Sequence, residues 1–85
     1  MNVSSDVLAA HLGDDAVLLD LAAKRYYRLN ETAAVVFRAI ESGEGRAGAI
    51  SALVAGFEVS EPDAAAAVDA LLGDLAARGI VAPNG

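Results

Sequence analysis

The sequence predicts a single α+β domain over residues 1–85, in which a three-stranded antiparallel β-sheet is followed by three α-helices. Up to Leu29, short runs of alternating hydrophobicity are separated by turn-forming residues, a pattern typical of strands. From Asn30 onwards, apolar residues recur three and four positions apart, which is typical of amphipathic helices. A length of 85 residues is enough for one hydrophobic core and short of what two domains need.

The first two strands are expected over residues 6–12 and 16–21. Residues 13–15, Gly-Asp-Asp, separate them and favour a tight turn. Alternation gives the second strand one apolar face, made by Val17, Leu19 and Leu21. Asp20 takes the opposite face.

The third strand is expected over residues 25–29, Arg-Tyr-Tyr-Arg-Leu. Tyr27 and Leu29 share one of its faces, and Tyr26 and Arg28 share the other. Three consecutive short strands with tight connections predict an antiparallel meander.

The first two helices are expected over residues 31–42 and 47–56. Asn30 is a good N-cap for the first helix, and Gly43 ends it by allowing a left-handed conformation. The apolar stripe of the first helix consists of Ala33, Val36, Phe37 and Ile40. That of the second helix consists of Ile50, Leu53, Val54 and Phe57.

The third helix is expected over residues 61–78, with Ser60 as N-cap and Gly79 as its end. Its core stripe consists of Val68, Leu71, Leu72 and Leu75. The apolar residues 80–81, Ile-Val, predict that the C-terminal tail packs against the domain. Two helices joined by a short turn, beside a small sheet, make the domain winged-helix-like.

Composition excludes several classes of protein. The net charge is −6, and the absence of Cys excludes a disulfide framework, a thiolate zinc site and a cysteine nucleophile. No run of about 18 apolar residues is present to span a membrane, and the N-terminus lacks the pattern of a secretion signal. We therefore expect a cytoplasmic protein whose partner is neither a membrane nor a nucleic acid, because binding phosphates needs clustered cations.

The sequence predicts neither catalytic residues nor a cofactor or metal site. His11 is the one histidine and has no Cys or second His to form a metal site with. Asp14 and Asp15 suit a turn better than a calcium loop, and no glycine-rich phosphate-binding motif is present. We therefore do not expect an enzyme.

Two features remain as candidates for binding. One is a cationic cluster around two tyrosines, formed by Lys24, Arg25, Tyr26, Tyr27 and Arg28. The other is a stripe beside the core stripe of the third helix, formed by Ala65, Asp69, Leu72 and Ala76. Each also has a purely structural interpretation, because charges protect edge strands from aggregation and Ala favours helices.

Four segments carry a resemblance to a known family. They read Leu18-Leu19-Asp20-Leu21 followed by Arg25-Tyr26-Tyr27-Arg28-Leu29-Asn30-Glu31-Thr32-Ala33, then Ile50-x-x-Leu53, then Val68-x-x-Leu71-Leu72-x-x-Leu75-x-x-x-Gly79-Ile80-Val81. Over about residues 6 to 82, the chain resembles PqqD-like proteins, the recognition elements of ribosomally synthesised and modified peptides.

The resemblance implies three antiparallel strands followed by three helices. It also implies binding of the N-terminal leader of a precursor peptide for delivery to maturation enzymes. The chain is most similar to standalone lasso-peptide members, whose partners would be a transglutaminase-like leader peptidase and a macrolactam-forming synthetase. It departs from PqqD proper at residues 22–25, Ala-Ala-Lys-Arg, where a Pro- and Gly-containing turn is usual. The alternatives are a PqqD-type chaperone for a radical-SAM enzyme and a winged-helix DNA-binding regulator; acidic residues on the third helix oppose the latter.

The resemblance places the leader antiparallel to the third strand, in the cleft beside the third helix. An extended peptide there would complete the open sheet edge as a fourth strand. The expected peptide-binding residues are Lys24, Arg25, Tyr26, Tyr27, Arg28, Leu29, Ala65, Val68, Asp69, Leu72 and Ala76. Among them, Tyr27 and Leu29 would form the sheet-side wall of the cleft. Its helix-side wall would consist of Val68, Leu72 and Ala76, with Asp69 meeting a leader cation, and Lys24 and Arg28 a leader carboxylate.

Overall fold

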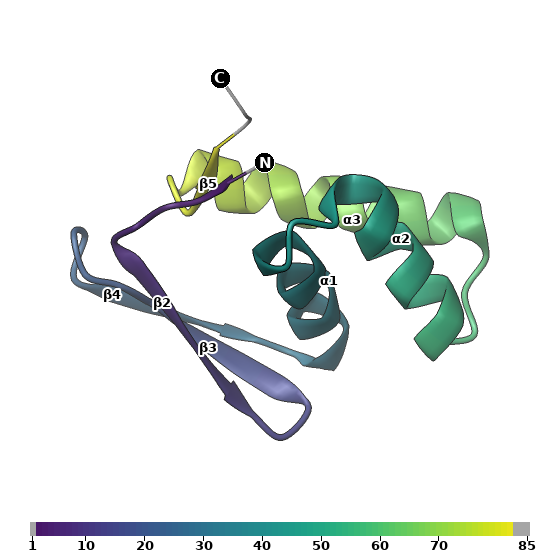
Figure 1. Ribbon diagram of the computed structural model, residues 1–85, viewed down its shortest axis with the longest axis horizontal. Helices are drawn as coiled ribbons and strands as arrows, with labels where there is room; N and C mark the ends of the chain where they lie inside the picture. Colours follow the sequence, from purple (N-terminus) through teal and green to yellow (C-terminus); the bar gives the residue numbers. More distant parts are fainter. Residues whose placement is uncertain (1, 83–85) are drawn as a thin grey trace.

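The expected meander is present in the computed structural model, which describes residues 2–82 (Figure 1). It consists of β2 (Val7–Leu12), β3 (Asp15–Asp20) and β4 (Arg25–Leu29), paired antiparallel in the order β2-β3-β4. Strand β3 starts one residue earlier than expected, because Asp15 pairs with Leu12 and leaves only two residues in the turn. The first of them, Gly13, has φ of +63°, which a glycine adopts without strain.

The alternation in β3 is as expected, but its buried face is the one that carries Asp20. Ala16 and Leu18 are fully buried there, and Leu18 belongs to the same core cluster as Phe37. Asp20 is 8% exposed, and its Oδ1 accepts a hydrogen bond of 3.0 Å from the backbone N–H of Ala23. A carboxylate at the end of a strand is therefore satisfied by the following turn, and the more apolar face of β3 is left outside.

The three helices are α1 (Glu31–Glu41), α2 (Gly45–Gly56) and α3 (Glu61–Ala77). The Asn30 side chain caps α1 by accepting from the backbone N–H of Ala33 at 2.9 Å, and the Ser60 side chain caps α3 in the same way. Helix α2 has no side-chain cap and begins two residues earlier than expected. Local capping thus explains why the starts of α1 and α3 were predictable and that of α2 was not.

The core lies between the sheet and the helices. Helix α1 packs against β3 and β4, and α2 packs against both α1 and α3 (Figure 1). The largest fully buried side chains come from the sheet, all three helices and the tail: Phe37, Leu18, Leu53, Ile80, Val36 and Val68.

A second, two-stranded sheet joins the two ends of the described chain and was not expected from the sequence. Strands β1 (Asn2–Val3) and β5 (Val81–Ala82) pair antiparallel, with Val3 opposite Val81. The backbone N–H of Ser4 also donates to the carbonyl of Ile80 at 2.8 Å. The tail therefore packs as expected but pairs with the N-terminal strand, and within residues 2–82 the only strand beside β4 is β3.

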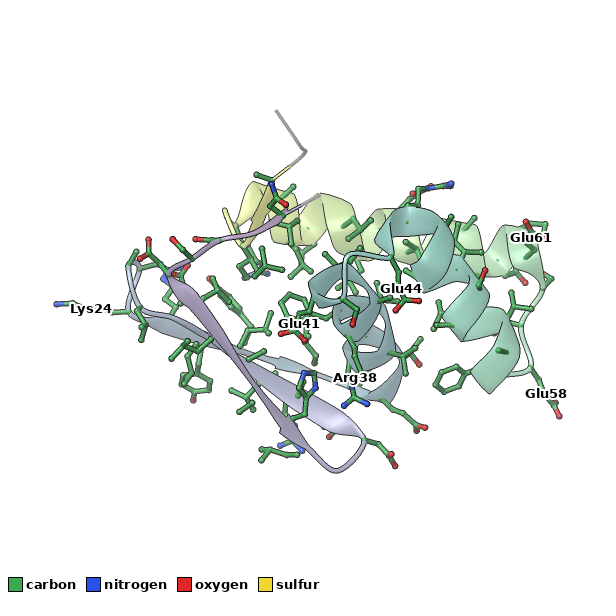
Figure 2. All side chains as sticks on the ribbon, in the orientation of Figure 1. Lys24, Arg38, Glu41, Glu44, Glu58 and Glu61 are labelled. Atoms are coloured by element: carbon green, nitrogen blue, oxygen red, sulfur yellow. The ribbon has the colours of Figure 1, made fainter. Side chains whose placement is uncertain are left out.

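The turn between β3 and β4 places Lys24 at the extremity of the molecule, with its side chain pointing into solvent (Figure 2). Its φ is +57°, and among residues 2–82 it is the one non-glycine residue with a positive φ. A Lys therefore occupies a left-handed position that suits glycine.

None of the helices in the described part of the chain is both long enough and apolar enough to span a membrane.

Candidate functional site

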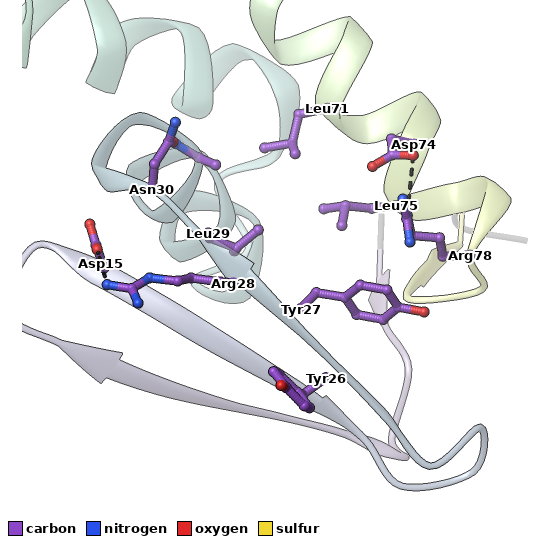
Figure 3. Close-up of a pocket in the computed structure, with 11 residues that line it drawn as sticks. Asp15, Tyr26, Tyr27, Arg28, Leu29, Asn30, Leu71, Asp74, Leu75 and Arg78 are labelled. Atoms are coloured by element: carbon purple, nitrogen blue, oxygen red, sulfur yellow. Dashed lines mark hydrogen bonds and ion pairs between the residues drawn. The ribbon is translucent and has the colours of Figure 1, made fainter.

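A groove of about 590 Å³ runs between the outer edge of β4 and helix α3 (Figure 3). Its lining comes from the sheet, the start of α1 and the last two turns of α3: Asp15, Tyr26, Tyr27, Arg28, Leu29, Asn30, Ala33, Leu71, Asp74, Leu75 and Arg78. The middle of the groove is apolar, and charged side chains stand at its borders.

The sheet side of the groove is made by Tyr27 and Leu29. Strand alternation points both toward α3, whereas Tyr26 points to the other side of the sheet (Figure 3). Leu29 is buried, and Tyr27 is half-buried with its ring along the groove. These two side chains give a bound chain an apolar surface to contact.

The helix side is made by Leu71 and Leu75, with Asp74 and Arg78 at its border. Positions three and four apart lie on one helix face, so the four side chains line up along α3. Leu75 is 2% exposed and part of the core, while Leu71 remains half-buried and accessible. Leu71 is therefore the main apolar contact that α3 offers to a ligand.

Two ion pairs mark the borders of the groove. Arg28 donates to Asp15 at 3.0 Å, and Arg78 donates to Asp74 at 3.2 Å. The guanidinium of Arg78 also lies 4.8 Å from the centre of the Tyr27 ring, within cation–π distance. The pKa of Arg78 is raised, mainly by its interaction with the Tyr27 side chain and next by its interaction with Asp74, so the guanidinium stays charged. Arg78 thus connects α3 to β4 across the groove.

The backbone of β4 faces the groove along its open edge. One side of the strand is paired with β3, from Ala16 opposite Leu29 to Asp20 opposite Arg25. On its other side, no strand of residues 2–82 pairs with it, so alternate N–H and C=O groups remain available. An extended peptide can bind such an edge as an added strand.

Four of the expected site residues line this groove: Tyr26, Tyr27, Arg28 and Leu29. Arg25 starts the same strand, and Lys24 lies in the turn before it; both are exposed and outside the groove lining. Arg28 already forms an ion pair with Asp15, and this pair partly neutralises the positive charge that was expected to attract a leader carboxylate.

None of the five helix-side residues expected for the cleft lines this groove. Val68 and Leu72 belong to the same core cluster as Leu29 and Leu75 but, unlike them, do not line the groove. Asp69 accepts hydrogen bonds of 2.7 and 3.0 Å from Arg46 of α2. This hydrogen bonding is the main cause of the lowered pKa of Asp69. Ala65 and Ala76 share that flank of α3 by helical periodicity.

The difference between the expected cleft and the observed groove has a geometric cause. The core stripe of α3 has two flanks, and the sequence does not say which of them faces β4. The residues missed on the groove flank are Leu71, Asp74, Leu75 and Arg78. Their common spacing is visible in the sequence, where Leu71 and Leu75 also fit the core stripe and Arg78 fits the end of the helix.

Within residues 2–82, no group of three or more His, Asp or Glu side chains is placed to hold a metal ion. The Nε2 atom of His11 lies 3.0 Å from Oε1 of Glu41, so this histidine bridges β2 and α1.

Comparison with known proteins identifies similar sequences and folds. The family model described as coenzyme PQQ synthesis protein D (PqqD) matches residues 15–81. The structure of TbiB1 in complex with the TbiA(beta) leader peptide superposes with a TM-score of 0.92 at 25% identity, covering 100% of this chain and 99% of that one. A lasso peptide synthetase B1 complexed with the leader peptide gives 0.86 at 28% identity, covering 96% of each chain. No curated protein matches the sequence.

Proposed function

The chain belongs to the PqqD family, and we propose from this premise that it is a non-catalytic adaptor for a ribosomally synthesised precursor peptide. It binds the N-terminal leader, in a pathway of the lasso-peptide type, and delivers it to the leader peptidase and other maturation enzymes. The observation that carries the proposal is the open edge of β4 beside an apolar groove. The two similar solved structures, both complexes with a leader peptide, support it.

The leader binds as a fourth strand antiparallel to β4. Its backbone completes the hydrogen bonds of the strand edge, and alternate side chains enter the groove between Tyr27 and Leu71. Main-chain bonding supplies affinity for any extended peptide, whereas the groove selects which side chains are accepted. Selectivity therefore depends on the apolar walls.

Magnitudes favour the apolar contacts over the charged borders. Burial of one apolar anchor in the groove contributes about 1.5–3 kcal/mol. An exposed ion pair contributes roughly 0–1 kcal/mol, and Arg28 and Arg78 are already paired within the chain. We therefore expect leader binding to depend on Tyr27, Leu29 and Leu71 more than on either arginine.

The chemistry of maturation belongs to the partner enzymes. Among residues 2–82 the groove lining holds neither histidine nor a nucleophile beside a base, and its ionisable groups are two carboxylates, two arginines and two tyrosines. The proposed enzyme partners are a leader peptidase and a macrolactam-forming synthetase, which act on the peptide that the adaptor holds.

The test is a titration of isotope-labelled protein with a synthetic leader peptide of the precursor. We expect chemical-shift changes concentrated in residues 25–29 and 71–78, which form the groove. Changes centred on α2, or no change at millimolar peptide, would contradict the proposal.

A second candidate is supported by the family match itself, because that family is described by coenzyme PQQ synthesis. In this case the same groove presents a precursor to a radical-SAM enzyme. Binding measured in parallel with a lasso-type leader and with a PQQ precursor peptide separates the two, since the groove is common to both and the peptide is not.

A further inference from the structure

Helix α2 has very few polar side chains, although one of its faces is exposed to solvent. Arg46 and Ser51 are the only polar side chains of this helix. Ala49 and Leu53 are buried on its inner face, whereas Val54, near its end, is 43% exposed. Surface helices normally turn charged or polar side chains toward solvent. The outward face of α2 is therefore an apolar surface that no element of the described chain covers.

This face holds a second groove, of about 420 Å³, which we call the α2 groove. Helix α2 lines it with side chains that recur three and four positions apart: Ala47, Ile50, Ser51, Val54 and Ala55. This spacing places them in one continuous strip along the helix. None of them lines the groove beside β4. The α2 groove is therefore a separate surface of the molecule.

The surroundings of the α2 groove are negatively charged. Four carboxylates lie just before α2 or in the turn and the first helical turn that follow it: Glu44, Glu58, Glu61 and Asp63. Within the described chain none of the four takes part in an ion pair. Arg46, the one cation in the lining, is already bonded to Asp69. Figure 2 shows Glu58 and Glu61 at the opposite extremity of the molecule from Lys24. The α2 groove therefore suits an apolar surface that is bordered by cations.

The backbone of α2 determines what kind of chain the groove can take. Its N–H and C=O groups are bonded within the helix, so an extended peptide would gain no main-chain hydrogen bonds here, in contrast to the open edge of β4. A helix brings its own bonded backbone, and its ridges of side chains fit between those of another helix. With 12 residues, α2 is about 18 Å long. A partner helix of three turns matches this length.

A second copy of the chain fits the α2 groove poorly. Two copies placed face to face would bring the same four carboxylates together, while Arg46 is already bonded to Asp69. A helix face of this length covers roughly 180 Å² by ordinary helix dimensions, well below the roughly 800 Å² per partner of stable interfaces. A different protein that carries cations beside an apolar helix face, and that binds transiently, is the better match.

We propose that the α2 groove docks the macrolactam-forming synthetase, through a helix whose apolar face is bordered by Lys or Arg; the identity of the enzyme, though not the surface, rests on the proposed function. The leader lies on β4, so the peptidase that cuts it must reach that strand. The synthetase acts on the part of the precursor that follows the leader, and at the α2 groove it leaves the groove beside β4 uncovered. The chain then holds the leader and the synthetase on different faces at the same time.

The test measures two affinities for each variant: that of purified synthetase for the immobilised chain, by biolayer interferometry with and without bound leader, and that of labelled leader, by fluorescence anisotropy. Val54→Lys and Val54→Glu place opposite charges at one exposed position of the α2 groove, and Val54→Leu keeps that position apolar. Glu61→Lys reverses a bordering carboxylate. Its matched control is Glu31→Lys, because both glutamates are exposed and directly follow the N-cap of a helix. Circular dichroism and thermal unfolding confirm that each variant is folded.

We expect Val54→Lys to bind the synthetase at least tenfold more weakly, and Val54→Glu to lose less, because a cationic border on the partner repels only the lysine. Glu61→Lys should bind the synthetase at least threefold more weakly, whereas Val54→Leu and Glu31→Lys stay within twofold of the wild type. The leader affinity of the Val54 and Glu61 variants should also stay within twofold of the wild type.

Three results would each overturn the docking proposal. They are absence of synthetase binding by the wild type with and without leader, a loss in Val54→Lys no larger than that in Val54→Glu, and a wild-type dimer that Val54→Lys dissociates. A wild-type chain that binds the synthetase but not the leader would instead refute the proposed function and leave the docking surface standing.

Discussion

The two flanks of α3 carry similar residues but have different neighbours in the fold. On one flank Asp69 pairs with Arg46 of α2, and on the other Asp74 pairs with Arg78 beside Tyr27. Helix α2 lies beside the first flank, where Asp69 stays exposed, whereas the second flank faces the open edge of β4 and forms a groove. The difference teaches that the site arises from what packs beside α3 and not from the composition of either flank.

The largest expected effect distinguishes the core stripe of α3, which should determine stability, from its two flanks. Leu72 is buried at 6% exposure, so Leu72→Ala should lower the free energy of unfolding by about 2–5 kcal/mol. Urea denaturation measures this loss. Leader affinity of the remaining folded protein should be unchanged, and a large affinity loss without destabilisation would show that Leu72 is part of the groove after all.

The next test compares the flanks directly. Leu71→Asp removes the accessible apolar contact of the groove flank and should weaken leader binding about 10- to 100-fold. Ala76→Asp introduces the same charge on the other flank and should leave the affinity within about threefold. Fluorescence anisotropy reports both. Equal losses in the two variants would break the distinction between the flanks.

Within the groove, loss of an apolar contact should weaken leader binding more than loss of a charged contact. Tyr27→Ala removes both an apolar wall and the ring beneath Arg78 and should cost leader binding about 1.5–3 kcal/mol. Arg28→Ala should cost less than about 1 kcal/mol, since its exposed side chain already pairs with Asp15. Isothermal titration calorimetry ranks the two, and a reversed order would contradict apolar anchoring.

The smallest effect concerns the flank of α3 that carries Asp69. Arg46 lowers the folded-state pKa of Asp69 below its unfolded-state value near 3.8. The pair therefore stabilises the fold above that value, and the contribution is lost as the pH falls through the folded-state pKa. Asp69→Asn should unfold at a slightly lower temperature than the wild type at pH 7 and at the same temperature at strongly acidic pH. A difference that grows on acidification would contradict the sign.

Local signals made most of the fold predictable. Asn30 and Ser60 cap their helices through side-chain bonds to residues three positions on, so each signal lies within one short segment. Alternation identified all three strands of the meander, and it predicted that Tyr27 and Leu29 share one face of β4, which in the structure is the face toward the groove.

Long-range packing accounts for what the sequence did not predict. The β1–β5 pair joins two strands of two residues each, which are too short to show a pattern. Which face of β3 is buried depends on where α1 lies, and which flank of α3 is open depends on α2 and β4. The sheet half of the groove follows from one strand, whereas its helix half requires the relative placement of three elements.

The antiparallel pairing of β1 with β5 also has a consequence for protein engineering. Asn2 lies opposite Ala82, so a short linker is enough to join the two ends of the described chain. New ends opened at the exposed turn after Gly13 would then fall far along the sheet from the junction, with β4 and α3 uninterrupted. Such a circular permutant moves the chain ends from the β1–β5 pair to the β2–β3 turn, two residues before Asp15 at the border of the groove.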